Sequence, residues 1–250
     1  MVEKGISPLG DTLKAYAGVA VWQAADLPPR ESFRISYNGQ PSKALRSPFG
    51  DIAGIDVGPG SDGRPVVVVS SYKGRIALLN TRTRRWRTLK NGRSIGYFVS
   101  IWRHRLAYHR GDRVRLLDIR TGHVRRLPKT GYGPIELRGT TVLVAGLDIQ
   151  STTCPVDSSG GGEFIQWLVR PRSKKVLTRG CNGVSAPFFI GGTPAWMAGS
   201  TLIRGSQRIA LKESFELTFD GRHYYFMRIT DAQDSARDVL RTTRLADIRR

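Results

Sequence analysis

Three acidic residues stand at similar places in the chain, and carboxylates at such places could hydrolyse a bond. Asp56, Glu136 and Glu216 each precede, by a few residues, a turn that leads into an apolar strand. A pair of carboxylates on either side of a substrate supplies the acid and the base of glycoside hydrolysis. The alternative is structural: strand alternation can instead point these carboxylates between packed elements, where arginines would neutralise them. Both interpretations remain open at this point.

The two cysteines, Cys154 and Cys181, lie on either side of a predicted hairpin. Its strands are expected at 164–169 and 174–179, and an antiparallel pair would bring the two thiols together. A disulfide here would stabilise the chain by about 3–4 kcal/mol and would indicate an oxidising compartment. Two free thiols are the alternative. Two isolated cysteines do not make a zinc site, so we expect no metal and no cofactor.

The remaining chemistry-bearing residues form no recognisable catalytic set. His104 and His123 fall in predicted turns, His109 ends a predicted strand, and we expect all four histidines, His223 included, to be solvated surface residues. The glycines at 160–162 lack the Lys and Ser/Thr of a phosphate-binding loop, and no Gly-x-Ser-x-Gly occurs.

The elements that must position these residues are repeated. A turn followed by a short apolar strand occurs six times, with turn positions 18, 63, 104, 139, 192 and 221. Their mean spacing of about 41 residues is the period of a four-stranded propeller blade. Two consecutive copies, 75–89 and 113–127, match without a gap, each as a strand, a turn rich in Asn, Asp and Thr, and a second strand. One such sheet cannot bury both faces alone, so the units must stack.

The sequence therefore predicts an all-β fold, a β-propeller of four-stranded blades. Six blades are expected at about 10–49, 50–92, 93–129, 130–182, 183–213 and 214–250, and five blades with an irregular closure are the alternative. The repeat uses the whole chain, so we expect a single domain over 1–250. Because an open ring would expose a long strand edge, we also expect one terminal segment to pair within the blade formed by the other.

Part of the repeat resembles a known family. The segment 56–66, followed by 75–89, is similar to the TolB-type propeller repeat, which has a Ser-Pro-Asp-Gly-Arg turn, an apolar strand, an Asp-x-x-Thr-Gly turn and an Arg-rich strand. The layout resembles the TolB-like, WD-repeat-like propellers of high-GC bacteria, whose function is uncharacterised and many of which are exported. The resemblance implies a binding or scaffolding role and supplies no catalytic residues.

The chain is strongly basic, with 40 Lys and Arg against 20 Asp and Glu, a formal charge of +20. Many of these cations fall in the third turn and fourth strand of blades two to four: Arg82, Arg84, Arg85, Arg87, Arg120, Arg125, Arg126, Arg170, Arg172, Lys174 and Lys175. The fourth strand of a blade is outermost, so they predict a basic rim. The rim either protects strand edges from pairing or meets an anionic surface. Nucleic acid is the least favoured partner, because only Trp86 is interleaved with these cations.

These observations favour a monomeric, non-enzymatic binding or scaffold propeller that presents a top-face pocket and a basic rim to a protein or anionic partner. The alternative is a channel-centred hydrolase, glycosidase- or lactonase-like, that uses Asp56, Glu136 and Glu216. No apolar run reaches the ~18 residues of a membrane span. Residues 1–10 lack the pattern of a signal peptide, so a location outside the cytoplasm is expected only from the geometry of Cys154 and Cys181.

Overall fold

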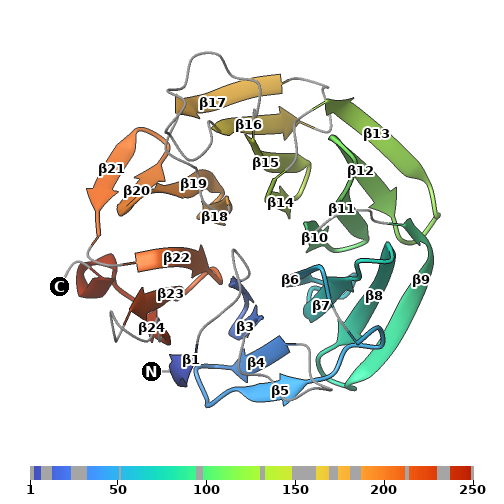
Figure 1. Ribbon diagram of the computed structural model, residues 1–250, viewed down its shortest axis with the longest axis horizontal. Coiled ribbons are helices and arrows are strands. Elements are labelled where there is room, and N and C mark those ends of the chain that lie inside the picture. The colour runs from blue at the N-terminus through green and yellow to red at the C-terminus, as the bar shows by residue number, and fades with distance from the viewer. Residues whose placement is uncertain are drawn as a thin grey trace.

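The computed structural model describes most of the chain. The described residues are 3–6, 13–23, 33–50, 52–93, 98–129, 133–147, 162–168, 174–180, 187–211, 214–229 and 237–248. Their strands form six four-stranded antiparallel sheets, arranged around a central axis as the blades of a propeller (Figure 1). The predicted fold class, an all-β propeller with four-stranded blades, is confirmed.

Each sheet uses four strands in order from the axis outward. The first three sheets are β2 (Lys14–Tyr16), β3 (Val19–Trp22), β4 (Phe33–Tyr37) and β5 (Lys43–Leu45); β6 (Gly54–Pro59), β7 (Pro65–Ser70), β8 (Arg75–Asn80) and β9 (Arg85–Arg93); and β10 (Val99–Trp102), β11 (Arg105–Arg110), β12 (Arg113–Asp118) and β13 (Val124–Lys129). The next two are β14 (Ile135–Arg138), β15 (Thr141–Leu147), β16 (Gly162–Leu168) and β17 (Lys174–Gly180); and β18 (Phe188–Ile190), β19 (Thr193–Ala198), β20 (Thr201–Arg204) and β21 (Gln207–Ala210).

The last sheet contains both ends of the chain. It comprises β22 (Ser214–Phe219), β23 (Tyr224–Ile229), β24 (Arg237–Thr242) and, outermost, β1 (Glu3–Ile6). The register pairs Glu3 with Val239 and Ile6 with Arg237. The expected closure by pairing of the two termini is therefore confirmed. A short 3₁₀ helix, η1 (Leu245–Ile248), follows, and no helix in the described part of the chain is long and apolar enough to cross a membrane.

The core lies between the sheets, because both faces of every sheet are covered by neighbours. In β7, Val67 and Val69 pack with Val21 of the first sheet, whereas Val68 between them packs with Ile101 of the third. Side chains that alternate along a strand thus serve two different interfaces. The middle strands therefore have continuous apolar sequences, without an alternation of polar and apolar residues.

Tight turns join the first and second strands of the sheets and fix the axial end of each blade. Ala17 and Gly18 have φ values of 46° and 82°, and Arg103 has a φ of 57°. Such left-handed turns match the twist of the strands that they connect. Backbone hydrogen bonds also join neighbouring blades at these turns. The Arg103 N–H donates to the carbonyl of Pro59 at 2.5 Å, and the Ala17 N–H donates to the carbonyl of Asp220 at 3.0 Å. We call the face closed by these turns the first-turn face.

Candidate binding site at the channel mouth

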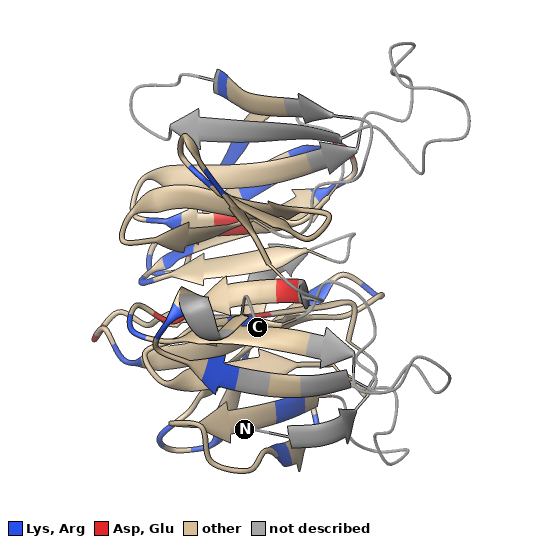
Figure 2. Ribbon diagram, turned by 90° about the vertical axis from the view of Figure 1, so that its left-hand side faces the viewer, with Lys and Arg blue, Asp and Glu red and all other residues tan. Residues whose placement is uncertain are grey.

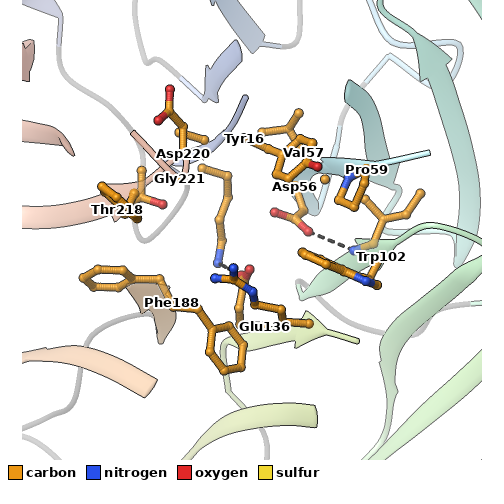
Figure 3. A pocket seen from close by; sticks show the side chains of 17 residues that line it. Tyr16, Asp56, Val57, Pro59, Trp102, Glu136, Phe188, Thr218, Asp220 and Gly221 are labelled. Carbon is orange, nitrogen blue, oxygen red and sulfur yellow. Dashed lines mark hydrogen bonds and ion pairs between the residues drawn. The ribbon is translucent and has the colours of Figure 1, made fainter. Parts of the chain in front are cut away.

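A small cavity lies on the axis, where the inner strands reach the first-turn face (Figure 3). Its lining comes from the innermost strand of every sheet and from the turn after β22: Lys14, Ala15, Tyr16, Asp56, Val57, Gly58, Pro59, Ile101, Trp102, Glu136, Arg138, Phe188, Phe189, Thr218, Phe219, Asp220 and Gly221. The cavity volume is about 60 Å³, which is enough for only a few water molecules. It can therefore hold the end group of a ligand, not a whole drug-sized molecule.

An ion pair crosses this cavity. Lys14, from the first sheet, places its Nζ atom 3.1 Å from Oε2 of Glu136, from the fourth. The two sheets stand on opposite sides of the ring, so the contact spans the axis. Both side chains are largely shielded from water, with exposed fractions of 8% and 21%. Glu136 is thereby neutralised by a cation that the sequence did not single out.

Asp56 is buried and links two blades. Its Oδ2 accepts a hydrogen bond of 2.9 Å from the backbone N–H of Ile101, in the inner strand of the next sheet. Burial first, and the nearby Glu136 second, raise the pKa of Asp56 to about 7, although Lys14 and the Ile101 N–H act in the opposite direction. Asp56 is therefore an acceptor built into the blade interface as well as part of the cavity wall.

The same arrangement recurs around the ring. The Ser100 hydroxyl oxygen accepts from the Leu137 N–H at 2.9 Å, and Oε2 of Glu216 accepts from the Leu13 N–H at 3.0 Å. Inner strands of neighbouring sheets share no ladder of backbone hydrogen bonds, so a polar side chain satisfies an N–H group that would otherwise be buried without a partner. Glu216 is absent from the cavity lining. The structure thus brings Asp56 and Glu136 to one cavity and leaves Glu216 outside it.

Arg138 is a second cation of the cavity that sequence reasoning missed, after Lys14. Its guanidinium carbon lies 5.5 Å from the ring centre of Trp102 and 5.7 Å from that of Phe189. Tyr16 extends this wall, edge-to-face against Trp102 with ring centres 6.2 Å apart. Among the described residues the Arg138 guanidinium has no hydrogen bond or ion pair, so aromatic contacts hold it while its donors stay available.

A sequence signal for this wall does exist. Aligning the repeat copies by their first turns places Tyr16, Trp102 and Arg138 at one position, immediately before the turn. That position ends an inner strand and therefore faces the channel mouth. Asp220, which also lines the cavity, instead caps a turn: its Oδ1 accepts from the N–H of His223 at 2.6 Å and its Oδ2 from that of Gly18 at 2.9 Å.

The cations of the predicted rim divide into two sets. Arg82, Arg84 and Arg120 are exposed in turns, and Arg85, Arg87, Arg126 and Lys175 are exposed on the outermost strands β9, β13 and β17, where Arg125 is half-buried. Lys and Arg are prominent in the turns along one edge of the disc in Figure 2. Lys174 belongs to β17, but its side chain lies outside the described part, as do Arg170 and Arg172.

The predicted disulfide cannot be placed, because Cys154 and Cys181 lie outside the described residues. The prediction for His109 is wrong: the residue is fully buried, since β11 continues past it and neighbouring sheets cover both faces of that strand. Its ring packs against Phe98, and burial lowers its pKa to about 4. No group of three or more His, Cys, Asp or Glu residues that could hold a metal occurs in the described part of the chain.

Comparison with known proteins supports the fold and nothing finer. No family model and no curated protein matches the chain. Solved structures do match it. One is the structure of PorZ, described as an essential bacterial surface component of the type-IX secretion system of Porphyromonas gingivalis, with a TM-score of 0.53 and 8% sequence identity. The fold is that of a β-propeller.

That match covers 98% of this chain and 39% of PorZ, so the propeller corresponds to less than half of the larger protein. At 8% identity the likeness concerns the backbone alone. It carries no site residues to this chain, and the TolB-like resemblance continues to rest on the sequence motifs.

Proposed function

We propose that this chain is a non-enzymatic binding propeller, which holds a protein or anionic partner with the cavity at the channel mouth and the basic rim. One observation carries the proposal: the cavity's carboxylates are engaged within the protein, whereas the donors of Arg138 are available. Glu136 is paired with Lys14, and Asp56 accepts the Ile101 N–H. Such a site is suited to recognise a ligand group rather than to transform it.

The hydrolase alternative has less support. Glycoside hydrolysis needs one carboxyl group that delivers a proton to the substrate and a second that attacks or activates water. Glu136 would have to leave Lys14 to do either, and Glu216, bonded to Leu13, lies outside the cavity. The cavity volume of about 60 Å³ is also well below the roughly 300–1,000 Å³ that is typical of small-molecule sites.

The cations support the binding role from outside the cavity. Exposed arginines on β9 and β13 lie next to turns that also carry arginine, so a partner at the rim would meet a positive field. A field of this kind accelerates the association of an anionic partner and is weakened by salt, with a screening length of about 8 Å at physiological ionic strength.

Affinity capture with matched variants tests the proposal. The full chain is immobilised, exposed to an extract of the cells that produce it, and the bound proteins are identified by mass spectrometry. Arg138→Glu tests the cavity, and a combined Arg82→Ser, Arg85→Ser, Arg87→Ser and Arg126→Ser variant tests the rim. Arg110→Ser, which removes an exposed arginine from the end of β11 on the opposite face, is the control.

We expect one set of partners to bind the wild type and the control, and to be reduced by the cavity or the rim variant. Equal capture by all four proteins would contradict the proposal. So would hydrolysis of glycoside or lactone substrates by the wild type that Asp56→Asn and Glu136→Gln both abolish, because that result would establish the enzymatic alternative.

A further inference from the structure

The cavity and the arginine-rich turns occupy the same face of the disc. The strands of each sheet are antiparallel, so the turn between the third and fourth strands returns to the face that holds the turn between the first and second. Described turns on this face carry the exposed residues Arg64, Arg82, Arg84, Arg103, Arg120 and Arg222. Arg64 is paired with Asp62 at 3.8 Å, but arginine exceeds acidic residues in these turns, so Arg138 lies at the centre of a face with an excess of positive charge.

The planar guanidinium group of Arg138 favours a carboxylate as its ligand. A guanidinium is a planar fork of N–H donors that matches a carboxylate with two parallel hydrogen bonds. Trp102 and Phe189 restrict this fork by their contacts with its carbon atom. A side chain held in place before binding loses less conformational entropy when the ligand arrives.

The charge of the cavity sets the charge of the ligand. Lys14 is paired with Glu136, whereas Arg138 acts on Glu136 through its charge, without an ion pair or hydrogen bond among the described residues. Arg138 is therefore the cation of the described lining whose donors can meet a ligand. The carboxyl groups of Asp56, Glu136 and Asp220 belong to the same walls and would repel a second negative charge. A carboxylate, with one charge and three heavy atoms, fits the volume of about 60 Å³, and a dianionic phosphate is disfavoured.

We propose that the first-turn face binds an acidic protein segment, one carboxylate of which enters the cavity and pairs with Arg138. This inference rests on the proposed binding function and names its ligand. The aromatic wall of Tyr16, Trp102 and Phe189 receives the apolar stem of the inserted group. The surrounding arginines steer further acidic residues of the segment and fix its orientation.

Small probes on the intact chain test the contact directly. Binding of 3-phenylpropionate, its neutral amide 3-phenylpropionamide, and phenyl phosphate is measured by calorimetry and by the ¹⁵N resonances of arginine Nε. We expect the carboxylate to shift the Arg138 resonance, and the amide and phosphate to bind about 10-fold or more weakly. Arg138→Gln should weaken the carboxylate by a similar factor, and Arg138→Lys by less.

Arg110→Gln is the matched control, since it removes the same group from an exposed position at the end of β11 on the opposite face. Equal weakening by Arg110→Gln and Arg138→Gln would overturn the inference, as would equal binding of acid and amide or tighter binding of the phosphate. Because Arg138 is half-buried at the end of β14, both Arg138 variants should fold. Arg138→Lys keeps a charge at the site and so tests the fork separately from the charge.

Two acetylated peptides identify the source of the carboxylate. One is amidated and contains glutamates, and the other has a free C-terminus and no acidic side chain. Binding of the glutamate peptide that is lost in Arg138→Gln supports the inference, whereas tighter binding of the peptide without acidic side chains would overturn an acidic segment as the ligand. A single-stranded oligonucleotide that outcompetes both would overturn it. If no carboxylate binds while partner capture persists, this inference fails and the proposed binding function stands.

Discussion

The inner and outer strands of the same sheets use polar residues in opposite ways. On the inner strands, Asp56, Ser100 and Glu216 are buried, and each accepts an N–H from the neighbouring blade. On the outer strands β9 and β13, Arg87 and Arg126 are exposed. The inner polar residues therefore fix the spacing of the blades, and with it the cavity, whereas the outer ones set the charge that a partner meets.

The last sheet closes the ring, so its third strand, β24, should contribute strongly to the stability of the fold. Deleting 239–250 removes most of β24, which lies between β23 and β1, together with the buried side chains of Val239 and Ile248. The N-terminal strand β1 would lose β24, its neighbour among the described strands. We expect the melting temperature, measured by circular dichroism, to fall by about 10 °C or more.

A second deletion sharpens this test. Removing 1–7 takes away only β1, which has one neighbour in its sheet, so the fall should be clearly smaller. Similar losses from both deletions would show that β1 contributes as much as β24. A melting temperature left unchanged by the larger deletion would refute the closure.

One added carbon atom should be enough to change the distance between two inner strands. A Cβ added to Gly58 in β6 would overlap the carbonyl oxygen of Ile101 in β10, which is backbone and cannot swing aside. Gly58→Ala should therefore force the second and third blades apart, strain the Asp56–Ile101 hydrogen bond, and lower the free energy of unfolding by about 3 kcal/mol. Denaturant unfolding measures the change.

Arg87→Ser on the outer strand of the same sheet is the comparison, with an expected change within about 0.5 kcal/mol. If the two variants lost similar stability, inner and outer strands would not differ in the way proposed.

The fold could be predicted because its signals are local. Turn residues such as Asp62 and Gly63, repeated at a blade period, identify strands and their order without knowledge of any long-range contact. Closure was also predictable, because an unpaired edge is costly wherever it occurs.

The site could be predicted only in part, because a blade strand has two buried faces. Asp56 and Glu216 look alike in the sequence, yet only Asp56 lines the cavity. The Lys14–Glu136 pair joins residues 122 positions apart across the ring, and no local pattern specifies it. His109 was misassigned for the same reason: the end of an inner or middle strand is surrounded by other blades, which a single strand's sequence does not reveal.

The smallest expected effect is on the pH dependence of stability. It comes from a variant that keeps the hydrogen bond of an inner carboxylate and removes its charge. Asp56→Asn keeps an oxygen that can accept the Ile101 N–H but removes the ionisable group. In the wild type the folded chain raises the pKa of Asp56 to about 7, chiefly by burial, from an ordinary value of 3.8. Between these values the folded state binds more protons than the unfolded state, so the free energy of unfolding contributed by Asp56 is fully present below pH 3.8 and declines as the pH rises toward 7.

The asparagine variant lacks this decline. Between pH 5 and pH 7 its free energy of unfolding should therefore rise relative to the wild type by about 2 kcal/mol, since each pH unit inside the window contributes at most about 1.4 kcal/mol. Asp62→Asn, which removes an exposed carboxylate from the first turn of the same sheet, is the control. Parallel pH curves for Asp56→Asn and the wild type would mean that Lys14 keeps Asp56 charged throughout. In that case Asp56 would carry a negative charge at every pH tested. That charge would weaken the binding of a ligand carboxylate to Arg138.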